Sequence, residues 1–96
     1  MRVVRLDIIQ EAQKRHAGAK SRLSAWTVEA KAATWTSFQD VRDRYPKTDK
    51  VGDRYVFDIG GNRYRLITSI NFGGGVIVVR WFGTHADYSK IKVEEA

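Results

Sequence analysis

Hydrophobic positions change their spacing about halfway along the chain. Between residues 7 and 46 the apolar side chains recur at helical intervals of three and four positions. From residue 54 onward they alternate with polar residues and include many β-branched and aromatic side chains, which is typical of strands. The pattern therefore predicts a mainly helical first half and a sheet-forming second half.

The first half begins with a strand and a helical hairpin. A β-branched run at residues 2–6 predicts the strand, while residues 7–18 and roughly 20–33 predict the two helices. Asp7 is expected to cap the first helix, because a glutamine three residues later can reach back to it.

A third, shorter helix is expected within residues 36–46. Ser37 and Asp40 have the spacing of a capping pair at its start, and Pro46 ends it. Residues 47–53 are polar and predict a loop.

The second half predicts three strands, at residues 54–59, 62–72 and 76–82. A glycine pair at 60–61 and a glycine triplet at 73–75 separate these strands, so two consecutive hairpins are expected to make an antiparallel meander. A short helix is expected to start at Thr84, where the sequence repeats the capping pattern, and residues 92–96 are expected to fray. We therefore expect residues 1–96 to form a single two-layer α+β domain, with an antiparallel sheet packed against an N-terminal helical hairpin and a short C-terminal helix.

The first glycine turn predicts which side chains share a face of the sheet. If Gly60 and Gly61 make a two-residue turn, Asp58 pairs with Arg63, and Arg63 and Arg65 lie on one face. The opposite face is then apolar and faces the core, with Tyr64, Leu66, Ile70 and Phe72.

The second glycine turn decides the face of Arg80. This arginine joins Arg65 if the turn has two or four residues and lies opposite it if the turn has three. We favour the first case, because an arginine directed into a core of leucine, isoleucine and phenylalanine is costly.

Charge gives this surface two interpretations. The chain has 17 lysines and arginines against 11 acidic residues, a formal charge of +6, as small nucleic-acid-binding domains often have. The basic face is either a solvated surface or a phosphate-binding one, since guanidinium groups match phosphate oxygens in a bidentate fork. Five aromatic residues among the basic ones either stack bases or pack in the core: Tyr55, Tyr64, Trp81, Phe82 and Tyr88. Trp26 and Trp35 are expected in the core.

Several classes of chemistry find no support in the composition. The chain has no cysteine and only two well-separated histidines, and its acidic residues lack metal-binding spacing, so neither a metal nor a cofactor is expected. No segment has the pattern of a signal peptide or the length of a membrane span, so we expect a cytoplasmic protein without membrane contact. His16 is expected to be structural or solvent-facing.

His85 is the candidate for chemistry, although it is equally expected as an ordinary helix-start residue. Capping by Thr84 places His85 in the first turn of the last helix and Tyr88 three residues later on the same side. With Arg65 and Arg80 nearby, such a set suits attack of an RNA 2′-hydroxyl on the neighbouring phosphate, which needs a base, an acid and cations.

Three segments together resemble the HigB family of bacterial toxins, within the RelE-like group: WTSFQDVRDRYP at 35–46, YVFDIGGNRYRLI at 55–67 and RWFGTHADYSKI at 80–91. The resemblance implies a RelE-type fold and an mRNA interferase that cleaves messenger RNA at the ribosomal decoding site. It also implies a HigA-type helix-turn-helix antitoxin as partner, with DNA contacted only through the antitoxin complex.

The resemblance also implies roles for individual residues. The resemblance implies Arg65, Arg80, His85 and Tyr88 as the catalytic residues. Separately, we expect Arg54, Arg63, Lys50 and Lys90 to bind RNA. The family motif leads us to expect an acidic residue after the tyrosine, where this chain has Ser89. The alternative function is a non-catalytic basic module that binds RNA or the ribosome.

Overall fold

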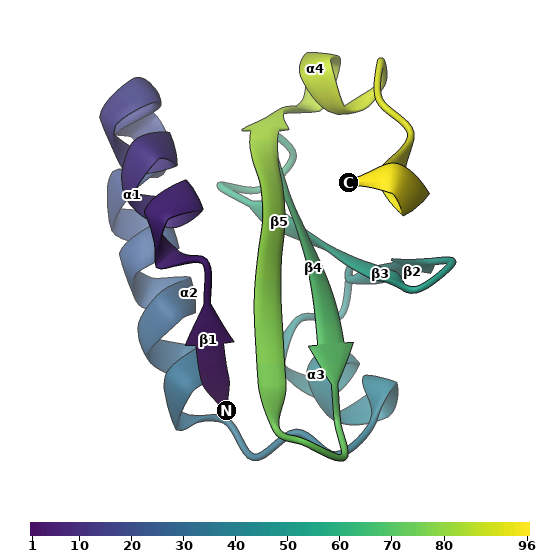
Figure 1. Cartoon of the computed structure of the whole chain (residues 1–96). Helices are drawn as coiled ribbons and strands as arrows, with labels where there is room; N and C mark the ends of the chain where they lie inside the picture. The colour runs from purple at the N-terminus through teal and green to yellow at the C-terminus, as the bar shows by residue number, and fades with distance from the viewer.

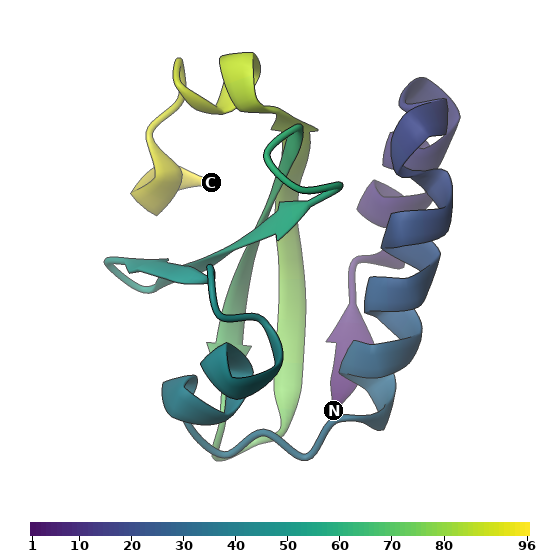
Figure 2. The same cartoon turned by 180° about the vertical axis from the view of Figure 1, so that it is seen from behind.

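Helices cover one face of a five-stranded sheet in the computed structural model, which describes residues 1–96 (Figures 1 and 2). Along the chain the elements are β1 (Arg2–Val4), α1 (Leu6–Arg15), the 3-10 turn η1 (Ala17–Ala19), α2 (Lys20–Ala32), α3 (Phe38–Arg44), β2 (Asp49–Val51), β3 (Arg54–Ile59), β4 (Tyr64–Asn71), β5 (Val76–Thr84), α4 (His85–Tyr88) and the 3-10 turn η2 (Val93–Glu95). The predicted α+β class is confirmed. None of the helices combines the length and apolar character needed to cross a bilayer.

The sheet has the strand order β1-β5-β4-β3-β2. The predicted β3–β4–β5 meander is confirmed, but β1 lies parallel to β5, so the complete sheet is mixed rather than antiparallel. The prediction of a loop at residues 47–53 was wrong, because residues 49–51 form β2 along β3. Gly52, with a φ of 59°, makes the tight reversal between these two strands.

The core lies between the sheet and the helices. The hairpin of α1 and α2 and the shorter α3 all contribute to one apolar cluster on one face of the sheet. Trp26 and Trp35 are buried there as predicted, with 1% and 9% of their surface exposed. Leu66 is fully buried on the sheet side of this cluster, which confirms the predicted core face of β4.

Two of the three predicted helix caps are present. Ser37 Oγ accepts a hydrogen bond from the Asp40 amide at 3.3 Å, and Thr84 Oγ1 accepts one from the Asp87 amide at 3.1 Å. The predicted Asp7 cap of α1 was wrong. The cap position is Arg5, in the left-handed region with a φ of 67°, and its guanidinium engages the Asp7 carboxylate at 3.0 Å.

The predicted two-residue turn at Gly60 and Gly61 was also wrong. Tyr64 pairs with Ile59 and Arg65 with Asp58, so four residues, 60–63, make the turn. Both glycines adopt positive φ angles, 65° and 70°, which starts a wider reversal. A register shift of two keeps every side chain on its predicted face, so Arg65 stays opposite the core, whereas Arg63 lies in the turn.

The second glycine turn also has four residues, because Asn71 pairs with Val76. Arg80 is therefore on the face of Arg65, as we favoured. A β-bulge interrupts the ladder next to it: Thr68 pairs with Val79, but Ile67 pairs with Trp81. Because β5 has this extra residue, the consecutive residues Arg80 and Trp81 both lie on the face opposite the core, and the chain returns to the core face at Phe82.

The C-terminal segment is ordered, so the prediction of a frayed tail was wrong. After α4 the chain turns back toward β3 and β2 (Figure 1). The Ala96 carbonyl accepts hydrogen bonds from Arg54 Nε and Nη2, at 3.0 and 2.8 Å. Val56 and Ile67, which lie on the sheet face away from the helices, are buried, at 2% and 0% exposure.

Candidate functional site

Three of the predicted catalytic residues, Arg65, His85 and Tyr88, lie at the end of β5, whereas Arg80 lies further down the strand on the same sheet face, opposite the core. We call this face, with Asp58, Arg65 and Arg80, the arginine face. At its upper end in Figure 1, α4 continues directly from β5 and lies next to the turn between β3 and β4. The His85 amide donates to the Arg63 carbonyl at 3.0 Å, which joins α4 to that turn.

Arg65 is buried and its donors are used within the chain. Its side chain forms an ion pair with Asp58, with 3.2 Å between Nε and Oδ1. Its Nη2 donates to the Asn62 side chain at 2.6 Å, and its Nη1 donates to the Asn62 and Tyr64 carbonyls at 3.3 and 3.1 Å. Because only 8% of Arg65 is exposed, the guanidinium has little surface left for a ligand. Its main contacts stabilise the turn at residues 60–63.

Tyr88 lies over the same arginine. The Arg65 guanidinium carbon is 5.9 Å from the centre of the Tyr88 ring, a cation–π contact. Burial raises the pKa of the Tyr88 hydroxyl, Asp49 and Asp58 raise it further, and Arg65 opposes them. The hydroxyl is therefore protonated at neutral pH, and it can donate a proton but not accept one.

His85 is exposed at the start of α4. Its backbone anchors the helix at both ends, since its amide donates to Arg63 and its carbonyl accepts from the Ser89 amide at 3.2 Å. The imidazole is left accessible to a ligand, one helical turn from Tyr88. The sequence prediction that His85 and Tyr88 share one turn of helix is confirmed.

Arg80 differs from Arg65 in its exposure. It lies three residues before Gly83, the β5 partner of Arg65, which corresponds to about 10 Å at roughly 3.3 Å per strand residue. Its Nε donates to Ser69 Oγ at 3.2 Å, while its exposed guanidinium end stays available for an anion. Of the two predicted catalytic arginines, Arg80 is thus the one that can contact a phosphate directly.

The four predicted RNA-binding residues are not all on one surface. Arg54, held by the Ala96 carbonyl, belongs to the arginine face, and Arg63 and Lys90 are exposed near α4. Lys50 pairs with Tyr55 and its amine lies 5.9 Å from the centre of that ring, on the core side of the sheet edge. The structure therefore does not bring Lys50 together with the other three.

Ser89, at the position where an acid was expected, has a local structural role. Its hydroxyl donates to the His85 carbonyl at 3.0 Å and so closes the single turn of α4. A carboxylate cannot donate this bond. The side chain is therefore part of the helix end, not a partner for the imidazole.

Two residues that hold Arg65 were not identified from the sequence. Asp58 was paired with the wrong arginine, and Asn62 was not singled out, although both hold Arg65. For Trp81 the sequence left two alternatives open, and the structure places it on the arginine face, over Gly83, rather than in the core. Strict alternation from Ile77 and Val79 would direct Trp81 into the core. The bulge turns Trp81 to the other face of the sheet, and nothing in the sequence pattern indicates this bulge.

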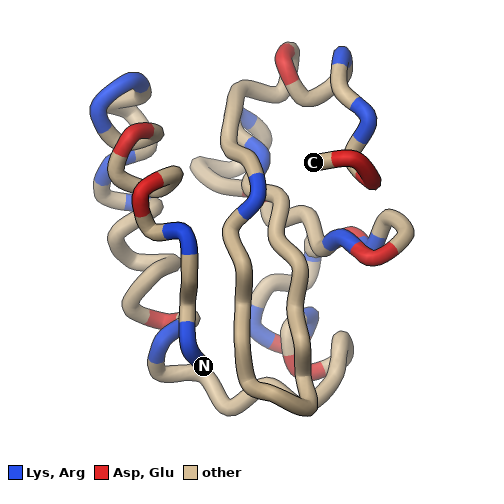
Figure 3. The backbone as a smooth tube through the Cα atoms, viewed as in Figure 1, with Lys and Arg blue, Asp and Glu red and all other residues tan.

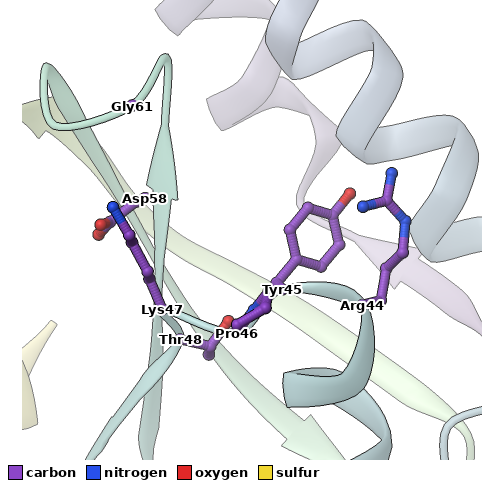
Figure 4. A pocket seen from close by; sticks show the side chains of 7 residues that line it. All are labelled: Arg44, Tyr45, Pro46, Lys47, Thr48, Asp58 and Gly61. Atoms are coloured by element: carbon purple, nitrogen blue, oxygen red, sulfur yellow. The ribbon is translucent and has the colours of Figure 1, made fainter.

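A hollow of about 280 Å³ lies beside the site (Figure 4). Its lining consists of Arg44, Tyr45, Pro46, Lys47, Thr48, Asp58 and Gly61. In Figure 4 the Lys47 side chain extends alongside Asp58, and the Tyr45 hydroxyl points toward Arg44. Only Asp58 is shared with the arginine face, so this hollow is a neighbour of the predicted site and not the site itself.

Positive charge extends beyond the arginine face. Lys and Arg also lie on the helical hairpin, as Figure 3 shows, with acidic residues among them. The net charge of +6 is therefore distributed over the surface, and the site is distinguished by its combination of side chains rather than by charge alone.

Comparisons with known proteins identify the class. A family model described as the RelE-like toxic component of a toxin-antitoxin system matches residues 19–91, and the fold is compatible with that class. The chain belongs to this family, the HigB toxins.

One curated relative is similar over part of the chain. It is an "mRNA interferase HigB" from Escherichia coli O6:H1 (strain CFT073), 33% identical over 64 residues. The match covers 64% of this chain and 62% of the length of that protein.

Proposed function

We propose that this chain is the toxin of a toxin-antitoxin pair and acts as an endoribonuclease on messenger RNA. The family supports the toxin role, and the name of the relative supports RNA cleavage. The observation that carries the chemistry is the single turn of α4 above the arginine face. It presents an exposed imidazole, His85, and a protonated phenol, Tyr88, three residues apart.

In the proposed reaction, an RNA 2′ oxygen attacks the adjacent phosphorus and the bond from phosphorus to the 5′ oxygen breaks. The products are a 2′,3′-cyclic phosphate and a 5′-hydroxyl end. His85 takes the proton of the 2′-hydroxyl, and Tyr88 gives its proton to the departing 5′ oxygen, after which exchange with water restores both groups. Tyr88 is assigned as the acid because its hydroxyl carries a proton at neutral pH and lies one helical turn from His85.

The arginines take different parts in this proposal. Arg80 binds the phosphate and stabilises the charge that develops on it, because its guanidinium end is exposed. Arg65 is a positioning residue, since its own donors are engaged and its guanidinium supports the Tyr88 ring. Arg54, Arg63 and Lys90 extend the contact along the RNA, while Lys50 lies off this path.

We also propose the partners that the family implies. Cleavage takes place on translated messages at the ribosomal decoding site, where the ribosome presents the RNA. A HigA-type helix-turn-helix antitoxin neutralises the toxin, and DNA is contacted only through that complex. Each of these proposals rests on the family membership and on the basic surface around α4.

The central test compares the two histidines. Purified His85→Ala protein should cleave a translated message about 10²- to 10⁴-fold more slowly, as expected for loss of an acid–base group, while binding ribosomes almost normally. His16→Ala is the control, because His16 packs edge-on against Tyr64 and Phe82 at 5.4 and 5.5 Å and transfers no proton in the proposed reaction. Primer extension measures cleavage, and thermal unfolding checks that each variant is folded.

Two outcomes would contradict the proposal. Cleavage by His85→Ala at the normal rate would remove His85 from the mechanism. Ribosome binding without any cut message, even by the unaltered chain, would favour the non-catalytic binding module.

A second experiment tests Arg80. Arg80→Gln should weaken RNA binding and reduce its salt dependence by about 0.7 in the logarithmic slope, the value for one lost phosphate contact to a single strand. Arg42→Gln, on α3 at the opposite side of the sheet, is the control and should leave the slope unchanged. An unchanged slope for Arg80→Gln would rule out the phosphate contact.

A further inference from the structure

Trp81 differs from the other two tryptophans in its surroundings. Trp26 and Trp35 are buried in the core, whereas Trp81 is only half-buried and lies on the arginine face, paired with Ile67. The bulge next to Arg80 produces this orientation. A large apolar ring is therefore partly exposed among charged groups.

The ring is held in a fixed seat. A Cβ atom added to Gly83 would lie 2.5 and 2.6 Å from two carbons of the Trp81 ring, so the ring lies directly across the backbone of this glycine. The Tyr88 ring contacts it from the side, with 6.4 Å between ring centres and a tilt of 47°. Glycine at position 83 makes room for this seat, and the strand supports one side of the ring while part of it stays open to solvent.

The residue before Trp81 carries a positive charge on the same sheet face. Arg80 precedes Trp81 in the bulge, is exposed, and keeps part of its guanidinium free. A nucleotide offers a matching pair of groups, a flat base that stacks on an aromatic ring and a phosphate that binds a guanidinium. Tyr88, the proposed acid, is in contact with the same ring, so a base held there lies beside the reacting phosphate.

We propose that Trp81 is the stacking platform for one base of a single-stranded RNA, next to the phosphate held by Arg80. This inference deepens the proposed function and rests on it for the identity of the ligand. Because every nucleobase has a stackable face, the subsite recognises an unpaired base without selecting its identity. A half-exposed but immobilised ring suits this role, since little conformational entropy is lost on binding.

The tryptophans themselves provide the first test. Trp81 is the one partly exposed tryptophan of three, so stacking should quench its fluorescence. The probe is a 2′-O-methyl hexauridylate, which cannot undergo 2′-hydroxyl attack. Saturable quenching is expected in the unaltered protein and in Trp35→Phe, but not in Trp81→Phe, which retains only the buried Trp26 and Trp35.

Affinity provides the second test. With a labelled form of the same oligonucleotide, Trp81→Leu should weaken binding by about 5- to 150-fold, the range for one base–aromatic stack. Trp81→Phe keeps a ring and should bind within about threefold of the unaltered protein. Thermal unfolding of each variant confirms that it is folded at the assay temperature.

The possible results separate this inference from the proposed function. Quenching and weakened binding without any cleavage of natural messages would contradict the nuclease and leave the platform in place. Normal RNA affinity of Trp81→Leu, no quenching, or no binding at millimolar oligonucleotide would overturn the platform. Loss of antitoxin binding alone in Trp81→Leu would likewise overturn it and assign the ring to a protein contact.

Discussion

Gly83→Ala should destabilise the protein through one specific collision. The added methyl group would lie 2.5 and 2.6 Å from Trp81 ring carbons, which is too close for carbon atoms that are not bonded to one another. Relief requires the ring to leave its seat or the strand to shift. Overpacking of this kind costs about 1–3 kcal/mol in unfolding free energy. For a domain of this length, each kcal/mol corresponds to a fall in Tm of about 4–8 °C.

The backbone itself does not oppose this substitution. Gly83 lies in β5 and does not have the positive φ angle that Gly60, Gly61 and Gly75 adopt. Gly73→Ala is therefore a matched control, because its methyl group would meet nothing closer than the Asn71 side chain at 3.6 Å. It should be neutral or slightly stabilising, as expected when alanine replaces an unstrained glycine.

A double-mutant cycle in urea isolates the collision. If the methyl group acts through the indole ring, Gly83→Ala should cost about 1–3 kcal/mol less in a Trp81→Ala background than in the unaltered chain. Tryptophan fluorescence should also show increased solvent exposure of Trp81 in the single variant. Equal costs in the two backgrounds would refute the reasoning, because the destabilisation would then have another source.

Three further predictions concern the groups around the site and the core. Arg65→Met should lower the unfolding free energy by about 1–3 kcal/mol in urea, since its carboxylate partner loses an ion pair, and an unchanged midpoint would contradict this. Thr84→Ala removes the cap of the one-turn α4, so it should slow RNA cleavage clearly while changing Tm only slightly. Ser37→Ala, which removes the cap of α3, is the control: it should lower the unfolding free energy by about 1 kcal/mol and leave the cleavage rate unchanged. The hydrogen bond from Tyr45 lowers the pKa of Glu29 in the folded state. The ionised Glu29 therefore stabilises the folded protein at pH values above its unfolded-state pKa of about 4.3, and this stabilisation is lost as the pH falls through its folded-state pKa. Urea unfolding between pH 3 and 6 should therefore depend less on pH in Glu29→Gln, and equal pH dependence would refute this.

Local patterns predicted much of the fold. Helical spacing located α2 within a residue at each end, and the Ser37 and Thr84 caps were correctly placed because capping depends on residues only three apart. The predicted sheet face of Arg65 was correct although the predicted turn length was wrong, because a register shift of two residues leaves each side chain on the same face.

Long-range contacts explain the errors. The short strand β2 has few apolar residues, and it forms because β3 supplies a partner across the turn at Gly52. The cap of α1 failed because Asp7 pairs with Arg5, which itself adopts a left-handed conformation. The C-terminal tail is ordered by Arg54, 42 residues earlier in the chain, which no local pattern can indicate.

The candidate site also has features that the sequence predicts and features that only the tertiary structure decides. By itself the sequence determined that a histidine and a tyrosine share one helical turn after β5, because three-residue spacing fixes a helical face. Only the tertiary structure decided that Arg65 is occupied by Asp58 and Asn62 while Arg80 stays exposed, and that the ring of Trp81 lies on Gly83. These last features depend on strand register and on one bulged residue, which are set by pairing between strands and not by the residues nearby in the sequence.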